Sequence, residues 1–414
     1  MRILHVSWEY PPLVYGGLGH HVHGLATAQA AAGHEVVVVT QRPEGTSDEE
    51  LLDGVRVVRA AYEALRLPDA DLLGWVAGLD RALARAALRA RWTPDVVHAH
   101  DWVVGGAGRR LRDRLGVPLV ATLHATEAGR HQGWLPGSLS HAIHRAEFRL
   151  TLDARRVIVL SYAMRDDAAT MFGVPSDQLA VVPSGIDRRR WRPSRGAVAA
   201  TRERYAGEGP LVVTASRLEW EKGVHTLLDA VPRLRRRFPG LRVVIAGRGS
   251  QQGALEEQAR RLRLGRSTSF AGWLDERDLA ALLGAADAVV LPSVYEPFGL
   301  VALEAAVAGA PLVVSGTGGL AETVEDGCTG RTFAPLDATA LADAVTASLR
   351  DEAATATQVR AMTRRLREHD WSTVADRTAE VYAAAIDDVL PRPRRRLVVR
   401  DGNQLLSPTT PSDR

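Results

Sequence analysis

The segment VYEPFGLVALEAA carries two glutamates, Glu296 and Glu304, which stand eight positions apart with only non-titratable residues between them. It follows the apolar run DAVVLP, which is typical of a buried strand. Glu296 is therefore expected at the carboxyl end of a strand, where open α/β sheets bind ligands. Gly299 and Leu300 are expected to begin a helix whose first amides have no intrahelical acceptor. The two acids are either a cap and a solvated helix position, or two contacts to one ligand.

Lys222 is the only lysine in the chain, so the other 51 of its 52 basic residues are arginines. Against that background it indicates a site that needs a compact ammonium group; chance retention is the alternative. In SRLEWEKG it follows Arg217, after one apolar run and before a helical pattern. Two cations at a strand end beside a helix N-terminus form a clamp for an anion. The next strand ends in Gly247 and Arg248, a loop suited to close backbone contact with a ligand.

The first apolar run leads into the segment WEYPPLVYGGLGHHVHGLA, in which Gly16, Gly17 and Gly19 precede a helical pattern. Such a turn lets the backbone approach a ligand, and a helix N-terminus favours an anion there. The spacing matches neither the dinucleotide fingerprint nor a phosphate-binding loop with its lysine. A tight turn without a ligand is an equally good interpretation.

Two more strands of the first half end in polar residues. VVHAHDW places His100 and Asp101 at one carboxyl end, and VATLHATEAGRHQGW places His124 at another. His98 and His100 share a strand face, but no third residue has the spacing of a metal ligand, so no metal site is predicted. His98 is better explained as a hydrogen-bonded core residue.

Short β-branched runs alternate with longer helical patterns along the chain, which predicts right-handed βαβ units in parallel sheets. Two series of such runs flank a basic, proline-containing stretch, so we expect an α/β fold with two doubly wound, Rossmann-like domains that face a cleft. The expected parts are a first Rossmann-like domain at 1–185, a linker at 186–206, a second Rossmann-like domain at 207–370, a helical segment at 371–390 that is expected to cross back to the first domain, and a mostly disordered tail at 391–414. The expected strands are Ile3–Ser7, Glu35–Thr40, Asp95–Ala99, Leu119–Leu123, Arg156–Leu160, Leu211–Ser216, Leu241–Ala246, Asp287–Leu291 and Pro311–Ser315, and His20–Ala32 is an expected helix.

The composition excludes several other classes of protein. With 414 residues, 46% hydrophobic and 24% charged, the chain suits a globular protein of two domains. The net charge of +3 gives no reason to expect a nucleic-acid partner, and no apolar run has the length of a membrane span. A single cysteine, Cys328, and the lack of an apolar signal segment favour the cytoplasm. The oligomeric state is not predictable.

Several motifs together resemble one enzyme family. SRLEWEKG, EPFGLVALEA and GTGGLAETVEDG are similar to the C-terminal domain of retaining glycosyltransferases of the GT-B fold, in the large family 4. EYPPLVYGGLG, DVVHAHDW and ATLHATEAGRHQG resemble the N-terminal half of its glycogen- and starch-synthase-like members. The resemblance covers roughly residues 1–388. The sequence departs from the family pattern at two places. Val14 and Tyr15 stand where glycogen synthases have a lysine before the Gly-Gly turn, and Ser184 replaces the usual asparagine before Gly-Ile-Asp.

The resemblance implies that the domain at 1–185 is the acceptor side and that the domain at 207–370 binds the nucleotide sugar, and it implies a role for each matching residue. Arg217 and Lys222 would bind the donor diphosphate, Glu304 the ribose hydroxyls and Glu296 the hydroxyls of the transferred sugar. His124 and Asp101 would line the sugar and acceptor side, with His124 near the reacting carbon. Phosphate contacts are implied for the amides of Gly299, Leu300 and Val301 and for the Gly16–Gly17 turn, and contacts to the base for Gly247 and Arg248.

Asp69-Ala70-Asp71 matches a metal-binding Asp-x-Asp motif, but it precedes a helical pattern without following a buried strand, so a helix cap explains it better. Arg217 and Lys222 can supply the positive charge instead. We therefore predict a metal-independent hexosyltransferase without a bound cofactor. The first functional hypothesis is transfer of glucose from ADP-glucose or UDP-glucose to an α-1,4-glucan or a small glycoside acceptor. The second is transfer of another sugar to a lipid, glycoside or sugar-phosphate acceptor. A third, a sugar-binding protein on an inactive scaffold, predicts damaged charge positions, whereas those residues are all present.

Overall fold

A computed structural model describes residues 1–62, 71–207 and 209–388 of the chain. These residues divide into two compact units. Unit 1 comprises residues 1–159, 164–182 and 375–388, and unit 2 comprises residues 160–163 and 183–374. The predicted tail at 391–414 lies outside the described residues.

Unit 1 contains an eight-stranded sheet of order β3-β4-β2-β1-β5-β6-β7-β8, in which neighbouring strands are parallel except for β3 and β4. The order reverses beside β1, which has β2 on one side and β5 on the other. Such a reversal is the switch point at which doubly wound sheets open a crevice. The strands are β1 (Arg2–Val6), β2 (Glu35–Gln41), β3 (Glu49–Leu52), β4 (Val55–Ala60), β5 (Val96–His100), β6 (Leu119–Leu123), β7 (Arg156–Val159) and β8 (Leu179–Val181).

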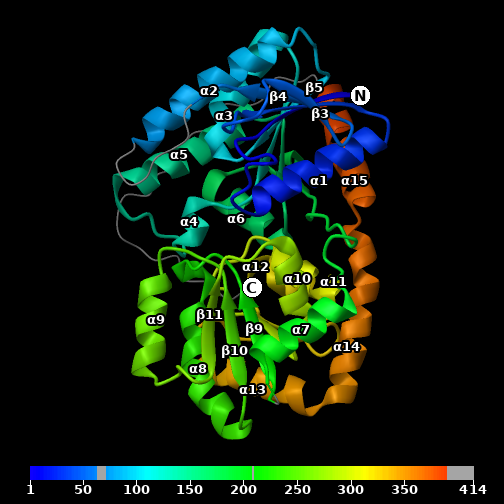
Figure 1. The fold of residues 1–414 in the computed structure, drawn as a ribbon. Helices are drawn as coiled ribbons and strands as arrows, with labels where there is room; N and C mark the ends of the chain where they lie inside the picture. The colour runs from blue at the N-terminus through cyan, green and yellow to red at the C-terminus, as the bar shows by residue number, and fades with distance from the viewer. Residues whose placement is uncertain (63–70, 208, 389–414) are drawn as a thin grey trace, which may run out of the picture. The chain divides into compact units, whose positions relative to one another are not determined.

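Helices cover both faces of this sheet, so its central strands are buried throughout and read as continuous apolar runs. Helices α1 and α15 lie along one face, and α2, α3 and α5 along the other (Figure 1). The helices are α1 (Gly17–Ala31), α2 (Leu72–Arg89), α3 (Gly105–Leu115), α4 (Glu127–Arg130), α5 (Gly137–Asp153), α6 (Tyr162–Phe172) and α15 (Trp371–Asp387), with the 3₁₀ turns η1 (Trp102–Val104) and η2 (Ser176–Gln178).

The hairpin of β3 and β4 is not predicted from the sequence. β3 forms the edge of the sheet, and its mixed charged and apolar side chains are exposed or partly exposed. β4 lies between β3 and β2 and is mostly buried, but Arg56 and Arg59 interrupt its apolar pattern. The signal that was overlooked is Asp53-Gly54, a two-residue loop between two short strands. Both residues have positive φ, 49° and 80°, as the tight turns of β-hairpins require.

Unit 2 contains a six-stranded, fully parallel sheet of order β11-β10-β9-β12-β13-β14. Numbered within the unit, this is the order 3-2-1-4-5-6 of dinucleotide-binding sheets, and its switch point lies between β9 and β12. The strands are β9 (Leu211–Ala215), β10 (Arg242–Ala246), β11 (Thr268–Gly272), β12 (Ala288–Leu291), β13 (Leu312–Ser315) and β14 (Arg331–Phe333).

The core of unit 2 packs the apolar faces of α8, α9 and α13 onto this sheet. Leu227, Val231 and Leu234 of α8 meet Val243 and Ile245 of β10, all almost completely buried. The helices are α7 (Arg195–Tyr205), α8 (Val224–Arg237), α9 (Gln252–Arg261), α10 (Glu276–Ala285), α11 (Leu300–Ala308), α12 (Gly318–Thr323), α13 (Ala338–Arg350) and α14 (Glu352–Arg365), with the 3₁₀ turns η3 (Trp220–Lys222) and η4 (Leu366–His369).

The segment at 186–206, predicted to be a linker, contains helix α7 and belongs to unit 2. Ser194 caps this helix, its hydroxyl accepting from the Ala197 amide at 3.2 Å. Arg202 anchors it by donating to the Ala285 carbonyl and the Asp287 carboxylate. The helical segment predicted at 371–390 contains α15, which is not a separate part. Its first residues, 371–374, belong to unit 2, and its residues from 375 onward belong to unit 1.

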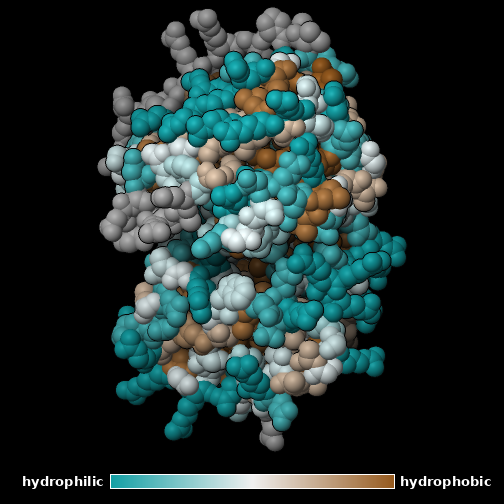
Figure 2. All heavy atoms as spheres, turned by 45° about the horizontal axis from the view of Figure 1, so that its top comes forward, coloured by the Kyte–Doolittle hydropathy of each residue, from teal (hydrophilic) through white to brown (hydrophobic). Residues whose placement is uncertain are grey.

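Polar side chains cover most of the face drawn in Figure 2, and hydrophobic side chains appear there in small separate patches. Within the described ranges, no helix combines the length and the apolar character that a membrane crossing needs.

Candidate active site

The switch point of unit 2 brings the predicted cation and the first predicted acid together. Lys222 follows β9 in η3, and Glu296 follows β12. The Lys222 Nζ donates to both carboxylate oxygens of Glu296, at 3.0 and 2.9 Å, and both side chains are about 15% exposed, at 14% and 16%. Ser293 adds a third hydrogen bond, its Oγ donating to Glu296 Oε2 at 3.0 Å. These bonds hold two opposite charges in one fixed position at the crevice of the sheet.

The loop that carries Glu296 is fixed from the side of β13. Ser315 Oγ donates to the Ser293 carbonyl at 2.6 Å, and Thr317 Oγ1 donates to the Val294 carbonyl at 3.2 Å. The Gly319 amide donates to the carbonyl of Glu296 itself at 2.8 Å. A Cβ on Gly319 would lie 2.4 Å from Phe298 Cα, so only glycine lets α12 pack this closely on the loop. The glycine pair at 318–319 therefore shapes the position of Glu296.

Glu304 lies about one turn into α11, which starts after Gly299 in a left-handed conformation with φ 95°. The side chain is partly buried, and within the described part of the chain no group donates a hydrogen bond to its carboxylate. Burial, together with the charge of Glu276, raises the pKa of Glu304 to about 8. A carboxyl group in this setting is suited to bind hydroxyl donors of a ligand. The first-turn amides of α11, at Leu300 and Val301, have no intrahelical acceptor.

The remaining predicted residues of unit 2 lie on the loops after β9 and β10. Arg217 has a side chain that is 48% exposed, and its Nη2 donates to Glu221 at 3.2 Å. A Cβ on Gly247 would lie 1.8 Å from the Ser216 carbonyl oxygen, so the two loops touch through their backbones. Arg248 is exposed, and its carbonyl accepts from the Leu218 amide at 2.8 Å.

In unit 1 the glycine turn is held by an acid that was not predicted. The buried Glu9 follows β1, and its Oε2 accepts from the amides of Tyr15 at 2.8 Å and Gly16 at 3.1 Å. Gly16 is the N-cap of α1, and Gly17 is its first residue. The Gly16 amide thus donates to a carboxylate of the chain, and the phosphate contact at Gly16–Gly17 stays a prediction.

Asp101 and His124 are joined directly. Asp101 follows β5 with φ 65°, and its Oδ1 accepts from the backbone amide of His124, which follows β6, at 2.7 Å. Burial raises the pKa of Asp101 to about 7, although the His124 amide, Arg130 and the Ala125 amide lower it. Burial also holds the pKa of the His124 ring well below its usual range, so this ring is neutral at pH 7.

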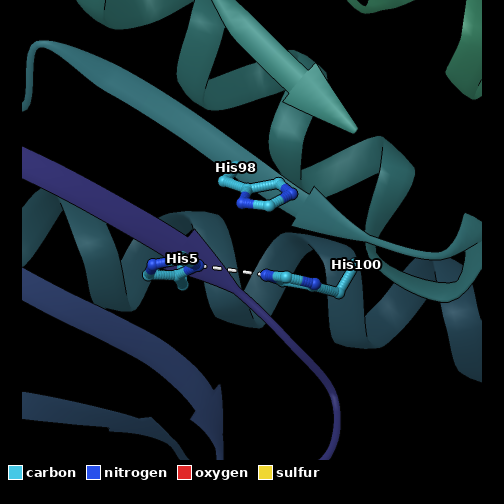
Figure 3. Close-up of side chains that lie close together, drawn as sticks. All are labelled: His5, His98 and His100. Carbon is cyan, nitrogen blue, oxygen red and sulfur yellow. Dashed lines mark hydrogen bonds between the residues drawn. The ribbon is translucent and has the colours of Figure 1, made fainter. Parts of the chain in front are cut away.

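Other histidines from neighbouring strands surround His124. His5 of β1 lies beside His98 and His100 of β5, and Figure 3 shows the hydrogen bond between His5 and His100. The sequence predicted no third ligand for a metal at His98 and His100, yet ring nitrogens of His5, His98 and His100 lie within 4.8 Å of one another. The same holds for His100, His124 and His21 of α1. His98 itself is a hydrogen-bonded core residue, as its sequence position indicated.

Asp71, the last residue of the Asp-Ala-Asp sequence, caps α2 by accepting from the Gly74 amide at 3.0 Å. This agrees with the interpretation of the sequence as a helix cap. Asp69 and Ala70 lie outside the described residues.

Two family models match the chain, "Glycosyltransferase Family 4" over residues 15–190 and "Glycosyl transferases group 1" over residues 201–367. The chain is 48% identical over 414 residues to a glycogen synthase from Mycobacterium tuberculosis, covering 96% of this chain and 98% of the relative. The chain belongs to glycosyltransferase family 4. The predicted membership, and with it the classification as a retaining hexosyltransferase that uses a nucleotide-sugar donor, is confirmed.

Solved structures confirm the GT-B fold. A sucrose-phosphate synthase from Thermosynechococcus elongatus superposes with a TM-score of 0.79 at 25% identity, covering 92% of this chain and 98% of that one. The catalytic domain of starch synthase IV from Arabidopsis thaliana, bound to ADP and acarbose, gives a TM-score of 0.77 at 19% identity, covering 93% and 99%. At 19% identity, the similarity to starch synthase IV supports the fold alone.

Three buried residues that support the candidate site in unit 1 were not predicted: Glu9, Gln29 and Tyr382. Glu9 carried a usable signal, because it is an acid directly after a buried strand. Gln29 stands on the apolar face of α1, four residues after Leu25, and a polar residue there indicates a buried partner. No local pattern links it to Tyr382, which is 353 residues away in sequence.

Lys222→Ala is expected to lower turnover by about 10²–10³-fold, the effect of removing one fixed charge from a reacting centre. It should also lower the free energy of unfolding by about 1–3 kcal/mol, because Glu296 loses its partner in a mostly buried position. Steady-state kinetics and urea denaturation measure the two effects. Arg260→Ala, which breaks the exposed pair of Arg260 and Glu257, is the control and should stay near wild type. Unchanged turnover in Lys222→Ala would contradict the assignment.

Gly319→Ala should move α12 away from the Glu296 loop, because its Cβ would meet backbone atoms of Phe298 and Pro297. We expect a loss of stability of about 1–3 kcal/mol and weaker donor binding. Gly253→Ala, where a Cβ has no neighbour within 4 Å, is the matched control and should leave both unchanged. Thermal unfolding and calorimetric titration with a nucleotide sugar make the comparison. Equal donor affinity in the two variants would disprove the shaping role of Gly319.

Glu304 should make the free protein less stable as the pH rises. Its folded pKa of about 8 lies above its ordinary value of 4.5, so between these values the folded protein keeps a proton that the unfolded chain has lost. Stability from this group is complete below pH 4.5 and falls toward pH 8, by at most about 1.4 kcal/mol per pH unit. Glu304→Gln should flatten the pH dependence of urea denaturation between pH 5 and 8.5. Identical slopes for the variant and the wild type would refute the raised pKa.

Proposed function

We propose that this protein transfers glucose from ADP-glucose or UDP-glucose to the end of an α-1,4-glucan, with retention of the anomeric configuration. The observation that carries the proposal is the Lys222–Glu296 pair at the switch point of unit 2, together with the Glu304 carboxyl group of α11, to which no described residue donates a hydrogen bond. The glycogen synthase that is 48% identical supports the choice of glucose and glucan. The single cysteine suits a reducing compartment, and we propose the cytoplasm.

The donor is proposed to bind along the carboxyl edge of unit 2. Lys222 and Arg217 bind the diphosphate, and the first amides of α11 at Gly299–Val301 add partial positive charge. Glu304 accepts hydrogen bonds from the ribose hydroxyls, and Glu296 from hydroxyls of the transferred sugar. Gly247 and Arg248 form the edge of the base site.

The proposed chemistry needs stabilisation of the departing diphosphate more than it needs a protein base. The acceptor hydroxyl oxygen forms a bond to the anomeric carbon from the leaving-group side while the bond to the phosphate oxygen breaks. The hydroxyl proton passes to the departing phosphate, so atoms and charges balance. Lys222 and Arg217 stabilise the negative charge that grows on the phosphate, and in this proposal no divalent metal is required. His124 and Asp101 of unit 1 contact the sugar and the acceptor.

Product analysis tests the proposal. The purified protein is incubated with ADP-glucose or UDP-glucose and with glycogen, maltooligosaccharides or maltose-1-phosphate, and the linkage of the product is determined. We expect new α-1,4 linkages with at least one glucose donor, and their loss in Lys222→Ala. No elongation of a glucan-type acceptor with either donor would reject the proposal. Transfer only to a lipid, an unrelated glycoside or another sugar phosphate would instead support the alternative acceptor class.

A further inference from the structure

A continuous line of hydrogen bonds connects Gln29 of α1 with His124. The Gln29 Oε1 lies 2.7 Å from His5 Nε2, and His5 Nδ1 lies 3.0 Å from His100 Nε2. His100 Nδ1 in turn lies 3.2 Å from His124 Nε2. Gln29, His5 and His100 are completely buried, so no solvent competes for these bonds.

The amide oxygen of Gln29 gives this line a direction. An amide oxygen only accepts, so His5 donates through Nε2–H, and its neutral ring then accepts at Nδ1. His100 must therefore donate to it through Nε2–H and accept at Nδ1, and His124 donates to that nitrogen through its own Nε2–H. The rings are neutral because burial lowers the pKa of His5 to about 4 and holds those of His100 and His124 well below their usual range. His124 is left with its proton on Nε2 and a lone pair on Nδ1.

The amide nitrogen of Gln29 extends the network on its other side. Gln29 Nε2 donates to Tyr382 Oη at 3.3 Å, and that hydroxyl lies 2.7 Å from His98 Nδ1. His98 Nε2 lies 2.7 Å from Thr122 Oγ1. On the side of His124, every donor has one acceptor along the path from His124 through His100 and His5 to Gln29. Aligned hydrogen bonds of this kind polarise and strengthen one another.

We propose that Gln29 is a positioning residue that fixes the tautomer of His124, by accepting a hydrogen bond from His5 and thereby orienting the protons on His5, His100 and His124. Gln29 lies two rings away from His124 and acts only through them. The tautomer follows from the hydrogen bonds of unit 1 alone. Its effect on catalysis rests on the proposed function, in which His124 contacts the reacting sugar.

A metal centre is a weaker account of the same histidines. Hydrogen bonds occupy both ring nitrogens of His5, His98 and His100, and the partners of His98 are two hydroxyl groups. A metal ion at either histidine triad would have to replace several of these bonds. The directed network accounts for the same nitrogens without that cost.

Nitrogen-15 NMR of the full-length protein with labelled histidine tests the tautomer directly. Long-range correlations between ring nitrogens and carbon-bound protons distinguish a protonated from an unprotonated nitrogen, and His124→Asn identifies the His124 signal. In the wild type we expect His124 to be protonated at Nε2. In Gln29→Leu, which removes the acceptor, the signal should change to a mixture of both tautomers. Gln29→Glu keeps an oxygen acceptor toward His5 and should retain the wild-type pattern.

Gln41→Leu is the matched control for the loss of a buried glutamine. Gln41 Nε2 donates to the Trp8 carbonyl at 2.9 Å, and none of the hydrogen bonds described above includes it. This variant should leave the His124 signal unchanged, whereas a general loosening of unit 1 would alter both leucine variants alike. A wild-type His124 protonated at Nδ1, or equal spectra for wild type and Gln29→Leu, would overturn the assignment.

Kinetics test the catalytic consequence separately. Gln29→Leu should lower kcat about tenfold with little change in the KM for the donor, and Gln29→Glu should stay within about twofold of wild type. A scrambled tautomer with unchanged kcat would overturn the positioning role while leaving the tautomer assignment intact. If the wild type transfers no sugar at all, the proposed function fails, and the NMR result still decides the tautomer.

Discussion

The ion pair of Lys222 and Glu296 constrains most of unit 2 around the site. Removing two charged groups from water costs roughly several kcal/mol per ion. Their mutual attraction offsets this cost only when the geometry is good and further hydrogen bonds satisfy the remaining donors and acceptors. Both requirements are met here, because the ammonium contacts both carboxylate oxygens and Ser293 binds the same carboxylate. The two residues must therefore be held to within a fraction of an ångström by loops that follow different strands. The order of the sheet, with β12 directly beside β9, makes this possible.

The surrounding backbone contacts follow from this constraint. Glycines at 247 and 319 permit neighbouring loops to touch without side chains between them, and hydroxyls of Ser315 and Thr317 bind carbonyls of the Glu296 loop. A site built in this way changes little when a charged ligand arrives, so the ligand does not have to supply energy to organise it. Glu304 receives no hydrogen bond from the residues that the structure describes. Its carboxyl oxygens are therefore available to bind a ligand. Its pKa is raised because burial disfavours the charged carboxylate, and the charge of Glu276 adds to this effect.

The sequence predicted the elements that bury β-branched residues on both faces, such as β1, β6 and β9, because continuous apolar runs between turn residues have few other interpretations. It also singled out Lys222, as the only lysine of the chain, and Glu296, as an acid that follows a buried strand; both lie on loops at the carboxyl edge of the sheet. It did not predict the β3–β4 hairpin, because charged residues interrupt the apolar pattern in both of its strands. The line from Gln29 to Tyr382 was beyond prediction, because 353 residues separate partners that meet only after α15 docks on unit 1.

The charged groups of the two units differ: unit 2 presents a fixed ammonium group, and unit 1 presents neutral imidazole rings. Unit 2 holds the Lys222 ammonium in a fixed position against Glu296, and an ammonium suits a leaving group that gains negative charge as the bond to the sugar breaks. Unit 1 surrounds His124 with rings that burial keeps neutral and with hydrogen bonds that fix their protons. In glycosyl transfer the sugar ring itself gains positive charge. An imidazolium at the proposed position of His124 would oppose that change, whereas a neutral ring with a fixed tautomer presents a dipole of constant direction. Burial of the histidine cluster is thus part of the chemistry that the proposed role requires, because it excludes the charged form that would slow the reaction.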